Sequence, residues 1–193
     1  MAQADVLRWQ KKYQDANLVD TLQSDNLLLR YEAMINNRGL ALDLAAGTCH
    51  SSVQLAQSKN KVIAVDCSIT ALQLGQQLAN RYNVKLIPLV ADLSCWSVPS
   101  CSFDMITCFR YLDRKMFPVL VDALKPRGLL IYKTFNEHYL NYSPRFNPKY
   151  VLRSGELEPY LSQLEIIECS DGASTKEIYS FAVCRKSYSI FRP

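Results

Sequence analysis

The fold of this chain is decided by residues 41–49, which read ALDLAAGTC, and by residues 61–66, which read KVIAVD. The first stretch is an apolar run that carries Asp43 and breaks at a turn of small residues around Gly47. The second apolar run also ends in an acid, Asp66. A strand, a turn, a helix and a second strand in this order bind nucleoside ligands at the carboxyl ends of the strands. The two stretches therefore predict a site for a nucleoside-bearing cofactor.

The acid inside the first run distinguishes two classes of cofactor. A dinucleotide places its pyrophosphate at the helix N-terminus, so that turn is rich in glycine and has no anionic side chain. Asp43 would repel a pyrophosphate and attract the ammonium or sulfonium of S-adenosylmethionine. Asp66 lies 19 positions after Gly47, close to the spacing of about 20 expected of an acid that binds ribose hydroxyls. The alternative for either aspartate is that it caps the helix that follows.

In these residues the chain resembles a class I S-adenosylmethionine-dependent methyltransferase. The similarity extends to three further segments: LVADL at 89–93, FDMITCFRYL at 103–112 and LKPRGLLIY at 124–132. In the family these correspond to the segment along the adenine, the fourth strand with its loop, and the turn into the fifth strand. Trp9 and Tyr13, in the pattern W-x-x-x-Y, resemble the branch of tellurite-resistance and small-molecule methyltransferases. The resemblance runs from about Trp9 to Cys184.

Two positions depart from the family's pattern. The family usually has Gly-x-Gly where residues 47–49 read GTC, and Lys-Pro-Gly-Gly where residues 125–128 read KPRG. Glycine serves positions of positive φ or of close approach to a ligand. Cys49 and Arg127 therefore either adopt an allowed conformation or carry strain of order 1 kcal/mol. We interpret both as tolerated variants, because the turn keeps Gly47, its small residues and both acids.

The resemblance implies roles for individual residues. Asp66 would bind the ribose, and Asp43 would face the methionine portion of the cofactor. Arg110 would meet the cofactor's carboxylate or an anionic substrate through its guanidinium fork; the alternative is a solvated surface arginine. The implied cofactor-binding residues are Trp9, Tyr13, Asp43, Ala45, Gly47, Asp66, Cys67, Ala91, Asp92, Leu93, Phe109 and Arg110.

The chemistry needs no conspicuous catalytic motif, because a sulfonium is already an activated electrophile. Methyl transfer is then an in-line displacement for which the protein supplies alignment and excludes water. Where the nucleophile must lose a proton, the candidate bases are Tyr111, Asp113 and His138, and the sequence does not choose among them. Substrate contacts are expected from Trp9, Tyr13, Tyr111, Tyr139, Tyr142, Arg145 and Phe146. The alternative is that these rings only pack against the sheet.

Composition agrees with a single domain over residues 1–193. The chain is 49% hydrophobic and 21% charged, with seven cysteines, two histidines and a net charge of +4. No apolar run is long enough to span a membrane, and no signal peptide is evident. Scattered cysteines in odd number are typical of reduced thiols in a cytoplasmic protein. We expect no metal site and no membrane or nucleic-acid partner; the oligomeric state is not determined by the sequence.

The alternation of elements predicts an α/β fold, a Rossmann-like sheet of seven mostly parallel strands with helices on both faces. The resemblance adds an antiparallel last strand. Predicted helices are 4–14, 24–35 with Ser24 as cap, 49–57, 68–80, 114–124 and 154–161. Predicted strands are 40–45, 61–66, 84–90, 103–109, 128–135, 164–169 and 177–184. Residues 1–38 are expected to cover the cofactor site, and residues 136–153 to form an irregular lid.

These features favour a methyltransferase whose partner is a small-molecule methyl acceptor. One alternative is an RNA or protein methyltransferase, which would need a basic groove that the dispersed lysines and arginines do not predict. Another is a non-catalytic S-adenosylmethionine-binding protein, which the changes at Cys49 and Arg127 would allow. Thiol-dependent metalloid chemistry at Cys95, Cys101 and Cys108 competes with the usual role of cysteine as a small buried hydrophobe. A nicotinamide dehydrogenase is disfavoured by the glycine pattern.

Overall fold

The strands and helices belong to two compact units, residues 1–97 and 98–193. The computed structural model describes residues 3–14, 21–35 and 39–188. Each unit is built around its own parallel strand pairs, and seven strands are present in all. Among the described residues, no helix combines the length and the apolar character needed to cross a membrane.

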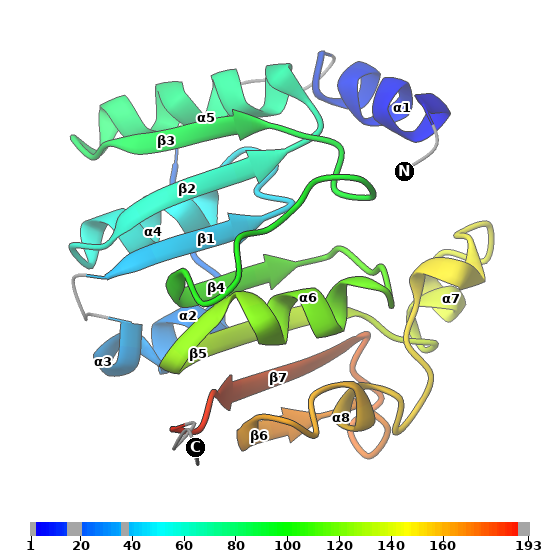
Figure 1. Cartoon of the computed structure of the whole chain (residues 1–193). Helices are drawn as coiled ribbons and strands as arrows, with labels where there is room; N and C mark the ends of the chain where they lie inside the picture. The colour runs from blue at the N-terminus through cyan, green and yellow to red at the C-terminus, as the bar shows by residue number, and fades with distance from the viewer. Residues whose placement is uncertain (1–2, 15–20, 36–38, 189–193) are drawn as a thin grey trace. The chain divides into compact units, whose positions relative to one another are not determined.

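The first unit holds three parallel strands in the order β3-β2-β1 (Figure 1). They are β1 (Leu40–Leu44), β2 (Lys61–Asp66) and β3 (Leu86–Val90). Helix α4 (His50–Gln57) follows β1, and α5 (Ile69–Arg81) follows β2; the two helices pack on each other and on the strands. Four of the five β1 residues are buried, as expected of a parallel strand covered on both faces. Asp43 and Asp66 therefore lie near the carboxyl ends of neighbouring strands.

The N-terminal helices differ from the prediction at one point. Helix α1 (Gln3–Gln14) is confirmed, but the predicted helix 24–35 is divided into α2 (Asn26–Arg30) and α3 (Glu32–Ile35). Tyr31 separates them because its backbone, at φ −106° and ψ 19°, leaves the helical region. The expected cap at Ser24 is also wrong: Asp25 caps α2, since its carboxylate accepts a hydrogen bond from the Leu27 N–H at 2.9 Å.

The second unit holds four strands in the order β4-β5-β7-β6. They are β4 (Phe103–Phe109), β5 (Leu124–Phe135), β6 (Glu165–Ser170) and β7 (Tyr179–Arg185). β4 and β5 are parallel, whereas β7 is antiparallel to both β5 and β6. Helix α6 (Met116–Ala123) connects β4 to β5. β5 begins before the predicted Gly128, because the register between β4 and β5 shifts and residues 124–127 are taken into the strand.

The segment after β5 is more ordered than the predicted irregular lid. It contains α7 (Tyr139–Tyr142) and a 3-10 helix, η1 (Pro148–Tyr150), and α8 (Leu157–Tyr160) follows it. A β-bridge between Asn136 and Leu152 joins the two ends of the segment. The Glu137 N–H donates to the Leu152 carbonyl at 2.9 Å, and the Leu152 N–H donates to the Phe135 carbonyl at 2.9 Å. The segment is therefore a closed loop that leaves and re-enters the unit at one place.

The predicted fold class is confirmed: a Rossmann-like, seven-stranded, mostly parallel sheet with helices packed around it and an antiparallel last strand. That residues 1–193 act as one domain, with residues 1–38 over a cofactor and residues 136–153 as a lid, stays a prediction.

Candidate functional site

The turn between β1 and α4 has an unusual backbone. Three of its residues are left-handed: Ala45 at φ 55°, Gly47 at φ 53° and Cys49 at φ 61°. Only glycine adopts this conformation without a steric cost. The turn is held by hydrogen bonds of 2.9 Å from the Ala46 N–H to the Val65 carbonyl and from the Cys49 N–H to the Ala46 carbonyl. Cys49 therefore carries strain, which is typical of segments that approach a ligand.

Arg127, the other position where the family has glycine, is also left-handed, with φ 66°. Both departures from the family pattern thus occur where the backbone itself favours glycine. The sequence identified these two positions correctly; it gave no sign that Ala45 shares the conformation.

Asp66 connects β2 to this turn. Its Oδ2 accepts a hydrogen bond from the Gly47 N–H at 2.8 Å, and its Oδ1 accepts one from the Ser68 N–H at 2.9 Å. Asp66 as a whole is only 7% exposed. Burial raises its pKa, and hydrogen bonds from the Ser68 and Gly47 backbone and from Cys67 partly oppose that rise. A carboxylate has about four acceptor positions over its two oxygens, which is the capacity that binding of ribose hydroxyls would use.

Helix capping does not account for either aspartate. The N-cap of α5 is Ser68, whose hydroxyl accepts from the Ala71 N–H at 3.2 Å, and the N-cap of α4 is Cys49. Asp43 is 2% exposed within β1 and accepts a hydrogen bond of 2.5 Å from the Ser52 hydroxyl on α4. The capping alternative is therefore wrong. Ser52 was missed because neither its type nor its spacing marks it as a partner of Asp43.

The thiols at the turn are neutral. Burial, followed by the charge of Asp43, raises the pKa of Cys49 far above its usual value. Burial, followed by the charge of Asp66, raises the pKa of Cys67 to about 12. Since the thiolate is the reactive form of cysteine, the raised pKa values disfavour either side chain as a nucleophile. No group of three possible metal ligands is found among residues 3–14, 21–35 and 39–188.

Helix α1 brings its aromatic pair to the turn. The Tyr13 hydroxyl lies 2.8 Å from where a Cβ on Gly47 would be, and the Trp9 ring stacks on the Tyr13 ring with centroids 6.1 Å apart. Gln10 fastens α1 to the start of α5: its Oε1 accepts from the Ser68 hydroxyl at 2.9 Å, and its Nε2 donates to the Thr70 hydroxyl at 2.5 Å. The sequence suggested Trp9 and Tyr13 but missed Gln10.

The residues predicted at the adenine continue from β3 toward Asp66. The Ala91 N–H donates to the Asp66 carbonyl at 3.0 Å. The Asp92 carboxylate accepts from the N–H and the hydroxyl of Ser94, at 2.9 and 2.8 Å, and so closes its own turn. Leu93 is buried. The first unit therefore brings together Trp9, Tyr13, Asp43, Ala45, Gly47, Asp66, Cys67 and Ala91–Leu93.

The other predicted residues lie in the second unit, where each has a local role. Phe109 ends β4, and the Arg110 N–H, in a left-handed residue, donates to the Lys133 carbonyl at 2.7 Å. The Tyr111 carbonyl accepts from the Tyr132 hydroxyl at 2.6 Å. Two candidate bases are in local turns: Asp113 accepts from the Lys115 N–H at 3.0 Å, and the His138 N–H donates to the Asn136 side chain at 3.1 Å. Their assignment to cofactor or catalysis stays a prediction.

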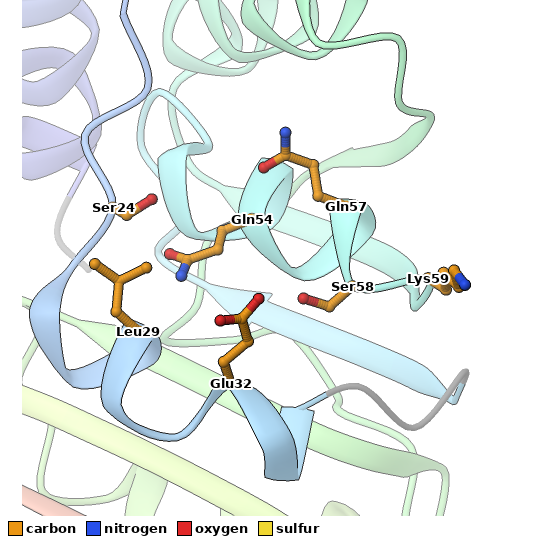
Figure 2. Close-up of a pocket in the computed structure, with 7 residues that line it drawn as sticks. All are labelled: Ser24, Leu29, Glu32, Gln54, Gln57, Ser58 and Lys59. Atoms are coloured by element: carbon orange, nitrogen blue, oxygen red, sulfur yellow. The ribbon is translucent and has the colours of Figure 1, made fainter.

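A separate pocket of about 200 Å³ lies at the other end of α4 (Figure 2). Figure 2 shows the Gln54 amide and the Glu32 carboxylate extending toward each other across it. The Gln54 Oε1 atom is buried and has no hydrogen-bond partner. The lining residues are Ser24, Leu29, Glu32, Gln54, Gln57, Ser58 and Lys59. None of them is a predicted site residue, so this pocket is not the candidate cofactor site.

Residues 41–128 match the family model described as "Methyltransferase domain". A comparison with curated protein sequences gave no match. The fold is similar to that of an S-adenosylmethionine-dependent methyltransferase from Clostridium acetobutylicum, with TM-score 0.66, 17% identity, and coverage of 96% of this chain and 98% of that one. A second S-adenosylmethionine-dependent methyltransferase, from Mesorhizobium loti, is similar with TM-score 0.65 and 14% identity, over 82% of this chain and 97% of that one. TehB from Haemophilus influenzae is similar with TM-score 0.72 and 13% identity, over 93% of this chain and 66% of that one.

At identities of 13–17%, the solved structures show the fold alone. The family model shows that residues 41–128 resemble a methyltransferase domain. The predicted methyltransferase class agrees with the family match at residues 41–128, and the predicted fold agrees with that of the solved S-adenosylmethionine-dependent methyltransferases. Residues 41–128 are therefore similar to a methyltransferase domain, and the fold around them is one that S-adenosylmethionine-dependent methyltransferases share.

Proposed function

We propose that this protein methylates a small molecule and that the first unit holds the cofactor through Asp66 and the turn at residues 45–49. The observation that carries the proposal is the Asp66 carboxylate, which is bound to the Gly47 N–H at 2.8 Å beside a left-handed turn. The groups around this turn are two buried carboxylates and two neutral thiols. That donor set suits a ligand with a sulfonium and ribose hydroxyls, and it disfavours a pyrophosphate.

When bound, S-adenosylmethionine supplies a methyl group on a positively charged sulfur, ready for in-line displacement. In the proposed arrangement Asp66 accepts hydrogen bonds from the ribose hydroxyls. Asp43 supplies negative charge beneath the turn, from a position shielded from solvent. Trp9 and Tyr13 cover the turn and exclude water from it. These residues align and enclose the donor, which is the main contribution a protein makes to this reaction.

An aromatic cluster in the second unit supports a small, apolar or aromatic acceptor. Phe135 stacks on Tyr139 at 4.0 Å and on Tyr179 at 5.0 Å, and Phe146 meets the Tyr139 ring edge-on at 5.0 Å. All four rings are half-buried, so each leaves part of its surface to a ligand. The Lys133 ammonium lies 4.8 Å from the centre of the Tyr179 ring. We propose that this cluster, in the closed loop after β5, binds the acceptor.

The proposal also includes a cytoplasmic location, which is supported by the seven cysteines, all of them free thiols. Tyr111, Asp113 and His138 remain the candidate bases for acceptors that must lose a proton. A thiol or oxyanion acceptor would need none.

The experiment that tests the proposal measures the thermal midpoint with S-adenosylmethionine, S-adenosylhomocysteine or NAD. The first two should raise the midpoint, because only the folded state offers the site, and NAD should not. The reverse result would overturn the cofactor assignment. Formation of S-adenosylhomocysteine with a panel of thiols, phenols and carboxylic acids then tests the acceptor class. Cofactor binding without turnover across that panel would instead support a non-catalytic binding protein, and methylation of RNA or protein would contradict the small-molecule acceptor.

A further inference from the structure

Helix α5 contains one glycine, Gly75, near its middle. Glycine disfavours a helix interior because it has the most backbone entropy to lose. Its φ is not in the left-handed range that would explain the choice. Gly75 is also buried. The presence of glycine at position 75 must therefore be explained by the residues that it contacts.

The neighbour of Gly75 is the strained turn at residues 45–49. A Cβ on Gly75 would overlap the Cys49 Sγ and lie 2.6 Å from the Cys49 Cβ. It would also lie 3.2 Å from the carbonyl carbon of Thr48. Glycine at position 75 thus leaves the space that the Cys49 side chain occupies.

Burial and hydrogen bonds fix the position of Cys49. Its side chain is 1% exposed, and its thiol donates to the Gly47 carbonyl at 3.6 Å. Its N–H donates to the Ala46 carbonyl, and its carbonyl accepts from the Val53 N–H, both at 2.9 Å. Any displacement of Cys49 therefore moves the turn, including the Gly47 N–H that donates to Asp66.

We propose that Gly75 is a positioning residue for the cofactor: the sizes of the side chains at positions 49 and 75 are coupled, and together they set the separation between α5 and the turn. Where the family has glycine in the turn and this chain has Cys49, the room for the thiol comes from Gly75. A larger residue at position 75 pushes the turn away from Asp66 and weakens cofactor binding. This inference rests on the proposed function for its binding readout, and on packing alone for its stability readout.

The test is a double-mutant cycle of wild type, Gly75→Ala, Cys49→Gly and Cys49→Gly/Gly75→Ala. Calorimetry with S-adenosylhomocysteine at 25 °C should show affinity at least tenfold weaker for Gly75→Ala. The affinity of Cys49→Gly is the reference for the second half of the cycle, and the double variant should stay within about threefold of it, because the overlapping thiol is gone. Gly155→Ala is the control for replacing a glycine without a clash, because nothing lies within 4 Å of its added Cβ. Unlike Gly75, Gly155 is left-handed, so Gly155→Ala should lower stability and leave the affinity unchanged.

Unchanged affinity in Gly75→Ala would overturn the inference, and so would a double variant as weak as Gly75→Ala alone. If Gly75→Ala does not fold, a folded double variant with recovered affinity supports the coupling, and an unfolded one refutes it. Once an acceptor is known, Gly75→Ala should raise the KM for S-adenosylmethionine and leave the KM for the acceptor unchanged, a split that general destabilisation would not produce. If wild type binds no S-adenosylhomocysteine, the proposed function fails; the coupling is then still decided by the urea midpoints of the four proteins.

Discussion

Replacing Asp66 separates its structural role from its role in binding. Asp66→Ala removes the acceptor for both the Gly47 N–H and the Ser68 N–H, which donate to the carboxylate at 2.8 and 2.9 Å. Both donors lie in the interior, and alanine offers them no replacement partner. Asp66→Asn retains one carbonyl oxygen and places an NH2 group against the other donor, so it should lose one bond and not two.

The magnitude follows from these two contacts. A hydrogen bond to a charged group contributes about 1.5–3 kcal/mol, and an unsatisfied buried donor costs about 1–3 kcal/mol. Part of that loss is offset because the buried carboxylate no longer has to be desolvated. We therefore expect Asp66→Ala to lower the free energy of unfolding by roughly 2–4 kcal/mol, and Asp66→Asn by about half as much. At this chain length each kcal/mol shifts Tm by about 2–4 °C.

Binding provides the second measurement. Loss of the bonds to the ribose should weaken the affinity for S-adenosylhomocysteine by about 1.5–3 kcal/mol, or roughly 10- to 150-fold in Kd. Urea denaturation measures the first effect and calorimetry at 25 °C the second. Asp25→Ala is the matched control, because it removes the cap of α2 and should cost about 1 kcal/mol of stability without changing affinity. Wild-type affinity in Asp66→Ala would refute its place in the site, and wild-type stability would refute its role in holding the turn.

Three other outcomes can be measured on the same protein. Arg127→Gly should raise the free energy of unfolding, measured in urea, by about 1 kcal/mol, because a φ of 66° suits glycine. The lost contact between Arg127 and the Tyr188 ring offsets only a small part of this gain. A destabilised variant would contradict the assignment of strain to Arg127. Glu156→Gln should cost about 1 kcal/mol, because Arg114 donates to both Glu156 oxygens, at 2.5 and 2.9 Å. The Arg114 hydrogen bond lowers the pKa of Glu156, so that contribution is present above the unfolded value of 4.5 and is lost as the pH falls through the folded value; a pH profile identical in Glu156→Gln would argue against it. Burial raises the pKa of Asp66 above 3.8, so the proton-linked stabilisation from its protonated form is fully present below 3.8 and is lost as the pH rises through the folded value, while the hydrogen bonds from the Gly47 and Ser68 N–H groups remain. Affinity for S-adenosylhomocysteine should rise over that window, and a profile that Asp66→Asn leaves unchanged would count against this assignment.

Some features follow from local sequence alone. The bounds of β2 and β4 agree with the prediction because each is a short apolar run that stops at a polar residue or turn. The two acids were placed correctly at the ends of neighbouring strands, since parallel strands joined by a helix bring their carboxyl ends to one edge. The left-handed residues Cys49 and Arg127 were also marked, through the glycines they replace.

Other features depend on contacts between distant residues, which no local pattern records. Tyr31 interrupts a segment whose sequence reads as one helix, and β5 starts early because its pairing with β4 shifts register. Gln10 finds its partner Ser68 58 positions away, and the thiol of Cys49 meets a glycine on another helix. Apolar periodicity and turn chemistry are properties of a few consecutive residues, so the sequence by itself determined the strands, the turn and the two carboxylates. Which side chains hold that turn in place was decided only when the helices packed, because packing depends on volumes brought together from separate parts of the chain.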